Sequence, residues 1–317
     1  MVSLTDVNAA FERICATTGV HQTPVMTSNS LDGLAGASLF FKCEHLQKTG
    51  SFKARGALNA VRSLDAVTAA KGVATHSSGN HGAALAWAAA SRNIPAFVVV
   101  PSNAPLAKKQ NIALHGAEII ECEPTLQARE ATLAEVVRRT GATYIPPYDD
   151  ERVIAGQGTA SLELLAQVAD LDIIVTPVGG GGLLAGSILA AGASPAAGAG
   201  IKVFGAEPAM ADDAFRSLAS GIRVTTHTPQ TIADGLQTTL GERNFAIIKP
   251  HCAGILLVSE DEIRAAMTLI WTRLKQLVEP SSAVTLAAVL RYPEHFAGQR
   301  VGLVLTGGNM TLPALGG

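Results

Sequence analysis

The stretch DIIVTPVGGGGLLAGS, residues 172–187, joins a short apolar run to a helical pattern through four consecutive glycines. A β-rich run, a loop and a helix in this order form the repeating unit of a parallel sheet covered by helices. Four glycines cost more backbone entropy than a plain turn requires, but their N–H groups can converge on an anion. We therefore predict a phosphate-binding loop formed by Gly179, Gly180, Gly181 and Gly182.

The same alternation of strands and helices extends away from this loop in both directions. Apolar runs occur at 38–42, 72–76, 95–101 and 117–122, and helical patterns are expected at 51–64, 81–92, 155–169 and 183–193. The alternation predicts an α/β protein with two parallel sheets and a boundary near Pro146 and Pro147. Ligands of such sheets gather at the carboxyl ends of the strands. Four short segments fall there: KTGSFKARG (48–56), SSGNHG (77–82), GGGG (179–182) and TGGN (306–309).

Composition narrows the class of partner. The chain has 317 residues, of which 48% are apolar and 16% charged, and its net charge is −2 without a dense basic run. Nucleic acid and anionic membranes are therefore not expected as partners, and a small diffusible molecule is. The uncharged segment 173–201 is long enough to span a bilayer, but its four glycines and two prolines would break a spanning helix.

The cysteines and the N-terminus suggest where the protein works. The four cysteines lie far apart and show neither CxxC nor Cys/His ligand spacing. No zinc site or disulfide framework is predicted, and reduced thiols in the cytosol are expected. The N-terminal residues carry acidic side chains in a helical spacing instead of a basic region followed by an apolar run. We therefore expect no signal peptide and a cytoplasmic protein.

A lysine stands where a helix would not favour one. Lys53 lies two residues after Ser51, a good N-cap, and so in the first turn, where unpaired N–H groups make a partly positive end. A lysine that attacks a carbonyl must be a free amine, and burial or a positive helix end favours that form. Lys53 is thus a candidate for forming a Schiff base, and the aldehyde cofactor with a phosphate group is pyridoxal 5′-phosphate.

The segment SSGNHG also joins a β-rich run to a helix. Ser77, Ser78, Asn80 and His81 place hydroxyl, amide and imidazole groups beside backbone donors at the helix start. This combination suits the carboxylate of a substrate. Simple N-capping would need only one of these polar residues.

A different cofactor is compatible with the glycine loop alone. Gly180, Gly182 and Ala185 satisfy the pattern G-x-G-x-x-A, and Glu207 closes the next strand about where a ribose-binding acid is expected. This pattern is typical of a nicotinamide-dependent dehydrogenase. It leaves Lys53, SSGNHG and TGGN without a role.

Five segments together resemble one family over essentially the whole chain. SFKARGA (51–57), SSGNHG (77–82), AGQGT (155–159), VGGGGLLAG (178–186) and TGGN (306–309) occur in the order typical of fold-type II pyridoxal-phosphate enzymes. The likeness is greatest to the serine/threonine dehydratase and serine racemase group, which includes 3-hydroxyaspartate dehydratases. It implies a homodimer whose larger domain, residues 1–73 and 148–317, contains an inserted smaller domain, 74–147, with the cofactor in the cleft.

The resemblance also assigns roles to residues that bind the cofactor. Lys53 would bond covalently to it, Asn80 would hydrogen-bond its 3-hydroxyl group, and Phe52 would pack against its ring. The loop Gly179–Gly182 would hold the phosphate, and Thr306 would face the pyridine nitrogen, where relatives usually have serine. A neutral hydroxyl leaves that nitrogen largely unprotonated, which favours elimination of a β-substituent over transamination.

The implied reaction is loss of water from a β-hydroxy amino acid, giving a 2-keto acid and ammonia. The Lys53 amine would remove the Cα proton, and the cofactor phosphate would assist departure of the hydroxyl. Ser78 matches racemases and 3-hydroxyaspartate dehydratases and permits racemisation, whereas the aromatic Tyr148 is typical of dehydratases. Arg129 matches an arginine that lies near a carboxylate in relatives with dicarboxylate ligands, although a solvated helix face would explain it equally well.

A cation site is also implied. In racemase-like relatives, a pattern similar to EPAMADD (207–213) binds a divalent cation, here through Glu207, the Ala211 carbonyl and Asp213. Such oxygen ligands suit Mg²⁺ or Ca²⁺, and an ordinary acidic helix start is the alternative. Three other functions remain open: a serine racemase, a nicotinamide-dependent dehydrogenase and a non-catalytic amino-acid sensor. Threonine, serine and 3-hydroxyaspartate all stay open as substrates.

Overall fold

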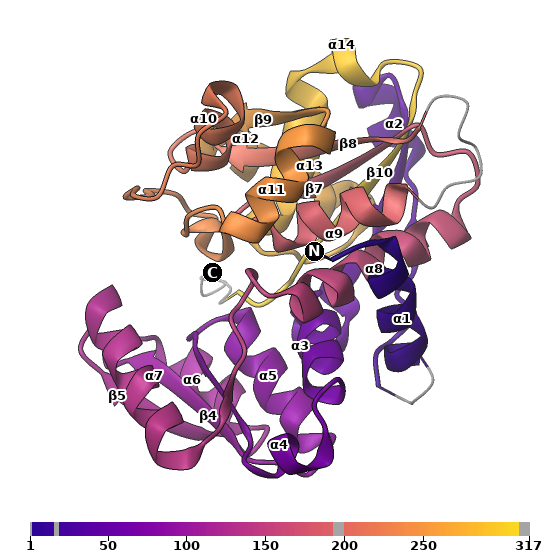
Figure 1. Cartoon of the computed structure of the whole chain (residues 1–317). Helices are drawn as coiled ribbons and strands as arrows, with labels where there is room; N and C mark the ends of the chain where they lie inside the picture. The colour runs from indigo at the N-terminus through magenta and orange to yellow at the C-terminus, as the bar shows by residue number, and fades with distance from the viewer. Residues whose placement is uncertain (1, 16–18, 193–199, 311–317) are drawn as a thin grey trace.

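The computed structural model describes residues 2–15, 19–192 and 200–310 and contains, within them, two β-sheets (Figure 1). The larger sheet has the strand order β1-β2-β10-β7-β8-β9 and is parallel except for the pairing of β1 with β2. Its strands are β1 (Val25–Met26), β2 (Ser38–Lys42), β7 (Ile173–Pro177), β8 (Lys202–Pro208), β9 (Gly254–Val258) and β10 (Arg300–Val304). The predicted α/β fold with parallel sheets is therefore confirmed.

The smaller sheet is parallel throughout and has the order β5-β4-β3-β6. Its strands are β3 (Val73–His76), β4 (Ala96–Pro101), β5 (Glu118–Cys122) and β6 (Thr143–Tyr144). All four lie between residues 73 and 144, inside the sequence of the larger sheet. The domain limits at 74–147 stay a prediction.

Helices cover both faces of each sheet (Figure 1). On the larger sheet they are α1 (Leu4–Cys15), α2 (Asn29–Ala35), α8 (Glu151–Gln167), α9 (Gly182–Ala191), α10 (Asp213–Ser220), α11 (Glu242–His251), α12 (Glu260–Leu269), α13 (Pro280–Arg291) and α14 (Pro293–Phe296). On the smaller sheet they are α3 (Lys53–Arg62), α4 (Ala66–Ala70), α5 (Asn80–Ala90), α6 (Leu106–Ala113) and α7 (Leu126–Thr140). None of the helices in the described residues has the length and apolar character needed to cross a membrane.

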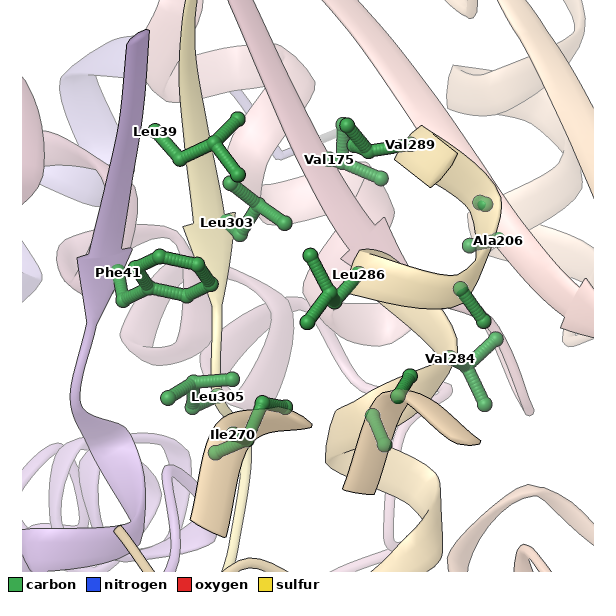
Figure 2. Packing of buried hydrophobic residues seen from close by; sticks show 14 of the residues in the cluster. Leu39, Phe41, Val175, Ala206, Ile270, Val284, Leu286, Val289, Leu303 and Leu305 are labelled. Carbon is green, nitrogen blue, oxygen red and sulfur yellow. The ribbon is translucent and has the colours of Figure 1, made fainter. Parts of the chain in front are cut away.

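The central strands of the larger sheet are apolar because both their faces are buried. Ile173 and Val175 pack with α13 on one face, and Ile174 packs with α8 and α9 on the other. Figure 2 shows the first of these layers, where Leu286 of α13 lies over β7 and β10. Each fully buried Leu, Ile or Phe contributes about 1.5–3 kcal/mol relative to an exposed one. This burial explains the continuous apolar runs in the sequence.

Glycines in AGQGT allow three helices to pack closely. A Cβ atom at Gly156 would lie 2.6 Å from Cα of Gly56, and one at Gly186 would lie 2.5 Å from the backbone nitrogen of Gly158. Helix α8 therefore packs against α3 on one side and α9 on the other without intervening side chains. Because α3 begins at Lys53 and α9 follows the glycine loop, this packing fixes two elements of the expected site relative to each other.

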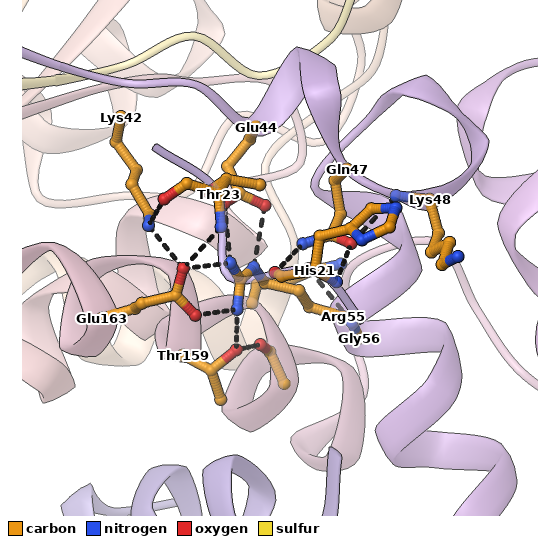
Figure 3. Close-up of polar contacts among 12 residues, drawn as sticks. His21, Thr23, Lys42, Glu44, Gln47, Lys48, Arg55, Gly56, Thr159 and Glu163 are labelled. Atoms are coloured by element: carbon orange, nitrogen blue, oxygen red, sulfur yellow. Dashed lines mark hydrogen bonds and ion pairs between the residues drawn. The ribbon is translucent and has the colours of Figure 1, made fainter. Parts of the chain in front are cut away.

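A buried ionic network also holds α3 in place (Figure 3). The Arg55 guanidinium is fully buried and donates to both carboxylate oxygens of Glu44 at 2.8 Å and to Glu163 at 3.1 and 3.2 Å. Lys42 also donates to Glu163, and Thr23 donates to Glu44 at 2.6 Å. Burial alone would raise the pKa of Glu44, but the charge and hydrogen bonds of Arg55 lower it below its ordinary value.

Replacing Glu163 with glutamine should strongly destabilise the protein. The variant leaves Lys42 and Arg55 with one buried carboxylate instead of two, and breaking a buried ion pair costs about 3–5 kcal/mol. Denaturant unfolding would measure the loss. The matched control is Glu135→Gln, which removes an exposed pair with Arg138 and should change the free energy of unfolding by less than about 1 kcal/mol. Equal effects of the two substitutions would contradict the role assigned to the network.

Candidate active site

A cavity of about 1490 Å³ lies where the carboxyl ends of the strands in both sheets are followed by loops. The four segments singled out in the sequence all contribute to its lining, although they are far apart along the chain. The predicted site residues that line it are Phe52, Lys53, Ser77, Ser78, Asn80, His81, Arg129, Gly179, Gly180, Gly181, Gly182 and Thr306. The loop after β7 supplies the glycines, and the loop after β3 supplies the serines.

Lys53 begins α3, but not in the way the sequence suggested. Ser51 is not the N-cap: its backbone is extended and pairs with Gly307, and Phe52 takes the cap position without a side-chain cap hydrogen bond. The amide of Phe52 donates to the Thr306 carbonyl at 2.9 Å. Pairing with residues 306–307 therefore replaces capping at this helix start and ties Lys53 to the TGGN segment.

The surroundings of Lys53 favour loss of the proton from its amine. Its Nζ atom donates to the carbonyl of Pro147 at 2.8 Å and lies 5.0 Å from the centre of the Phe52 ring. Burial lowers the pKa of Lys53 to about 8, against an opposing effect of the Glu279 charge. Among the described residues, no carboxylate forms an ion pair with it. A lysine in this state is a usable nucleophile and base near neutral pH.

The glycine loop presents unpaired donors. Gly179, Gly180, Gly181 and Gly182 are buried, and in the described part of the chain nothing accepts a hydrogen bond from their N–H groups. Buried N–H groups are nearly always paired in native proteins, so this set indicates a missing acceptor. Gly181 has a φ of 86° and stands at the N-cap of α9, whose partly positive end faces the same region. The loop is suited to a phosphate group.

Tyr148 packs directly on this loop. A Cβ atom at Gly180 would collide with the Tyr148 ring, so no other residue fits at that position. The Tyr148 hydroxyl is hydrogen-bonded to that of Thr238 at 2.9 Å. Asn244 donates to the carbonyls of Gly180, at 2.6 Å, and Tyr148, at 3.3 Å. Contacts with Tyr148 and Asn244 thus hold the loop in place. Its unpaired N–H groups are therefore positioned without a bound ligand.

The SSGNHG segment supplies groups of two kinds. Ser77 accepts a weak hydrogen bond from the amide of Gly79 at 3.4 Å, and the Ser78 hydroxyl has no partner among the described residues. His81 is 2% exposed, and its Nε2 bonds the carbonyl of Ile145 at 3.0 Å. Burial, with a smaller effect of Lys53, lowers the pKa of His81 to about 3, so the ring stays neutral. The serines are available to a ligand, while one His81 nitrogen is already occupied.

Glu279 is a site residue that the sequence did not reveal. It is 3% exposed, lines the cavity and accepts hydrogen bonds from Nδ2 of Asn80 at 2.9 and 3.1 Å. Burial raises the pKa of Glu279 to about 7, and the Asn80 hydrogen bond opposes this shift. A glutamate immediately before the first proline of a helix is commonplace, so no local signal marked it.

Ser282 is a second residue that was missed. Its hydroxyl lies 3.1 Å from the hydroxyl of Thr306 and also hydrogen-bonds the Gly307 carbonyl and amide, both at 2.8 Å. Thr306 is 4% exposed, and its side chain is paired with this neutral hydroxyl within the described residues. The position expected to face a pyridine nitrogen therefore carries no charge.

Arg129 lies on the outer wall of the cavity. It is half-buried on α7, and its side chain forms no hydrogen bond or ion pair within the described residues. Its charge is near enough to lower the pKa of His76, an effect second to burial. The His76 ring stacks on Tyr144, whose hydroxyl lies 3.2 Å from His76 Nε2. A free guanidinium facing a cavity is better placed for an anionic ligand than one on a solvated face.

The expected cation ligands lie away from this lining. Glu207 is fully buried and accepts the amides of Ala214 at 3.1 Å and Phe215 at 2.9 Å, so it caps the start of α10. Asp213 accepts the Leu240 amide at 2.7 Å through Oδ2, while its buried Oδ1 has no partner. The described residues contain no group of three or more His, Cys, Asp or Glu side chains arranged to hold a metal ion. The capping hydrogen bonds satisfy the buried carboxylate of Glu207, but Oδ1 of Asp213 is left without a partner in the part of the chain that the structure describes.

The residues present fit pyridoxal phosphate. The orphaned N–H groups of the glycine loop match its phosphate, and the poorly solvated Lys53 amine matches its aldehyde. Phe52 lies beside that amine, and the neutral Thr306 matches the pyridine nitrogen. Glu207, the acid expected to bind a ribose, is absent from the lining as described: it is fully buried and caps α10 instead. Of the two features that suggested a nicotinamide-dependent dehydrogenase, the glycine pattern and the ribose-binding acid, the second is therefore not found in the cavity.

Comparison with known proteins agrees with this fit. The chain is 50% identical to the serine racemase of Dictyostelium discoideum over 319 residues, covering 99% of this chain and 97% of that protein. It is 49% identical to the β-hydroxyaspartate dehydratase of Paracoccus denitrificans, covering 98% and 97%. The crystal structure of T.th. threonine deaminase superposes with a TM-score of 0.91 at 45% identity, covering 98% and 99%. Residues 16–307 match the family described as pyridoxal-phosphate dependent enzyme, and the chain belongs to that family.

Proposed function

We propose that the protein is a pyridoxal-phosphate-dependent dehydratase that removes water from a β-hydroxy amino acid to give a 2-keto acid and ammonia. The observation that carries this proposal is the pairing of a poorly solvated lysine amine with buried glycine N–H groups that lack acceptors, in one cavity. Proteins named β-hydroxyaspartate dehydratase, threonine deaminase and serine racemase among the relatives support the reaction class. A non-catalytic sensor would not need such a lysine.

Each group of this chain has a role in that reaction. Pyridoxal phosphate, when bound, supplies an electron-withdrawing ring that makes the Cα proton of the amino acid acidic. The Lys53 amine, whose pKa is lowered to about 8, takes that proton onto Nζ in its deprotonated form, and the Pro147 carbonyl orients it. Ser77 and the helix start at Asn80 bind the α-carboxylate. Net loss of the β-hydroxyl as water leaves an enamine, whose hydrolysis yields the keto acid and ammonia.

Racemisation is the second candidate function. The Ser78 hydroxyl lines the cavity and has no partner in the described structure, so it is available to exchange a proton with Cα, and the likeness to racemases implies that it does so on the face opposite Lys53. Tyr148 favours elimination, by its likeness to dehydratases. Here it fills the space above Gly180 and narrows the cavity beside the glycine loop. We therefore propose elimination as the main activity and racemisation as a side reaction.

Arg129 directs the choice of substrate towards a dicarboxylate. Its guanidinium faces the cavity without a protein partner in the described residues, and an Arg–carboxylate pair is among the strongest charge-assisted hydrogen bonds. Serine and threonine carry no second carboxylate to use it. We propose that a 3-hydroxyaspartate isomer is the preferred substrate, with Arg129 binding its β-carboxylate.

The first test is keto-acid release by the holoenzyme, measured with serine, threonine and 3-hydroxyaspartate isomers of both configurations. We expect release from a 3-hydroxyaspartate isomer to be fastest and to disappear in Lys53→Ala. Arg129→Ala should raise KM for 3-hydroxyaspartate roughly 10- to 100-fold, because a charge-assisted hydrogen bond contributes about 1.5–3 kcal/mol. The same variant should leave KM for serine nearly unchanged.

The matched control is Arg138→Ala on the same helix, since Arg138 is exposed and pairs only with Glu135 in the described structure. It should change neither KM value. Keto acid released equally by Lys53→Ala would contradict the dehydratase assignment. Equal changes of KM for serine and 3-hydroxyaspartate in Arg129→Ala would contradict the substrate assignment alone. Interconversion of serine enantiomers without keto acid would make the racemase the main function.

Covalent attachment of pyridoxal phosphate to the apoprotein should depend on pH with a midpoint near 8. Only the deprotonated Lys53 amine attacks the aldehyde, and its pKa is lowered to about 8, so the rate rises as pH increases through this value. An unperturbed lysine would give a midpoint near about 10.4. Stopped-flow absorbance of the bound cofactor across this pH range would measure the rate.

A substitution at Glu279 provides the control for this pH dependence. The Glu279 charge raises the pKa of Lys53, so Glu279→Gln should move the midpoint to lower pH. A midpoint near the ordinary lysine value in both proteins would show that the amine is solvated and would contradict the proposed electrostatics.

We also propose a divalent cation, Mg²⁺ or Ca²⁺, at Glu207, Asp213 and the Ala211 carbonyl. Both carboxylates are buried, and neither forms an ion pair in the described residues. Burial raises the pKa of Glu207, and the charge of Asp213 raises it further by a smaller amount. Asp213 Oδ1 is left without a partner. A cation would supply the missing charge and accept this oxygen as a ligand.

Added Mg²⁺ or Ca²⁺ should raise the thermal stability of the protein, and a chelator should reverse the effect. At 100 times Kd the gain is about 2.7 kcal/mol for one site. Asp213→Asn should abolish the gain, while Asp212→Asn, which removes a neighbouring carboxylate paired with Arg216, should retain it. Loss of the gain in both variants, or in neither, would contradict the site.

Assembly and location remain predictions. We propose a homodimer in the cytoplasm, following the family likeness and the cysteine pattern. Exposed apolar side chains at Leu46, Trp271 and Leu277 offer a contact surface for a second copy of the chain. Neither nucleic acid nor membrane is proposed as a partner.

A further inference from the structure

Asn309, the last residue of TGGN, has no role in the function proposed above, yet it makes two directed contacts. Its Nδ2 donates to the Thr49 carbonyl at 2.7 Å and to Oδ1 of Asn80 at 2.9 Å. A carbonyl oxygen can only accept, so the NH₂ group of Asn309 must face Thr49. The orientation of the Asn309 amide is therefore fixed by the backbone of a distant segment.

This orientation determines that of Asn80. Because Asn309 presents NH₂, the oxygen of the Asn80 amide must face it, and Nδ2 of Asn80 must face the other way. On that side Nδ2 donates to both carboxylate oxygens of Glu279. The backbone N–H of Asn309 also donates to Glu279 at 3.2 Å, which closes the arrangement. If the Asn80 side chain were reversed, its oxygen would face the Glu279 carboxylate and its NH₂ group would face the NH₂ group of Asn309. Both contacts would be repulsive. We call Thr49, Asn309, Asn80 and Glu279 the amide relay.

The backbone around the relay is shaped to admit Asn309. Thr49 has a φ of 58°, a left-handed conformation that is uncommon for a residue other than glycine, and it turns its carbonyl towards Asn309. A Cβ atom at Gly50 would collide with Oδ1 of Asn309. The amide of Gly308 donates to the Gly50 carbonyl at 3.0 Å. Hydrogen bonds thus hold segments 49–50 and 308–309 together, just N-terminal to Lys53 in the sequence.

We propose that Asn309 is a positioning residue, which fixes the Asn80 amide through the amide relay so that its NH₂ group is presented to the 3-hydroxyl group of the cofactor. The inference rests on the proposed function, in which Asn80 makes that contact. Its physical basis is pre-organisation: an amide held by partners of opposite polarity on its two sides does not have to reorient when the cofactor binds. Asn309 itself touches neither cofactor nor substrate in this account.

The test compares the affinity of the apoprotein for pyridoxal phosphate and for its analogue without the 3-hydroxyl group, followed by quenching of tryptophan fluorescence. The wild type should bind pyridoxal phosphate about 10-fold more tightly than the analogue. In Asn309→Asp, an isosteric side chain that only accepts hydrogen bonds draws the NH₂ group of Asn80 towards itself. That variant should lose about 10-fold in affinity for pyridoxal phosphate and little for the analogue.

Two further variants make the result specific. Glu279→Gln retains an acceptor for Asn80 and should keep most of the difference between the two ligands. If Asn309→Asp folds poorly, Asn309→Ala, which removes the donor to Asn80 without adding a charge, should likewise reduce that difference. Gln276→Ala removes a partly buried hydrogen bond to His45 outside the relay and should leave both affinities unchanged. Asn80→Ala should abolish the preference for pyridoxal phosphate altogether.

The outcomes separate the inference from the function on which it rests. Loss of the ligand preference in both Asn80→Ala and Asn309→Asp supports the relay. Equal weakening of both ligands in Asn309→Asp, or an unchanged preference, overturns it, because Asn309 would then act on stability alone or not at all. An unchanged preference in Asn80→Ala would overturn the contact of Asn80 with the 3-hydroxyl group, and with it the premise.

Discussion

The rest of the site depends on the burial of Arg55. A fully buried guanidinium is tolerated only with ionised acceptors around it, and Glu44 and Glu163 supply them from segments on either side of α3. Helix α3 cannot shift without unpairing these charges. Since Lys53 begins the same helix two residues earlier, the network holds the reactive amine through the backbone. The close contact of Gly56 with Gly156 also fixes the position of α3 against α8.

In this cavity, burial eases loss of the proton from Lys53, and the glycine loop is suited to an anion. Burial shifts two opposite groups towards their uncharged forms, lowering the pKa of Lys53 to about 8 and raising that of Glu279 to about 7. Binding the phosphate through cationic side chains would add positive charge around Lys53 and lower its pKa further. In the proposed function, backbone dipoles of the loop at Gly179–Gly182 would bind the phosphate without a titrating group, so burial and Glu279 would set the pKa of Lys53. Phosphate binding and amine reactivity are thereby separated.

The sequence predicted those parts of the site that are encoded locally. A strand, four glycines and a helix within twenty residues predicted the loop, and a lysine at an unfavourable helix start predicted Lys53. Glu279 and Ser282 were missed because their contacts with Asn80 and Thr306 join segments far apart in the chain. Ser51 was misjudged for the same reason: pairing with Gly307 overrode its local preference for capping. Helix limits were also displaced, with α8 at Glu151–Gln167 instead of 155–169.

In the proposed function, Thr306 would set the character of the reaction, because it would face the pyridine nitrogen of the cofactor. A carboxylate there would keep a proton on the pyridine nitrogen, and the ring would store the negative charge that develops when the Cα proton leaves. Thr306 is instead buried against the hydroxyl of Ser282, and neither side chain can supply a negative charge. With a weaker electron sink, the charge is released most easily by expelling a group from Cβ. A substrate with a β-hydroxyl provides that exit, which is why the neutral pair favours elimination over reactions that require a long-lived carbanion.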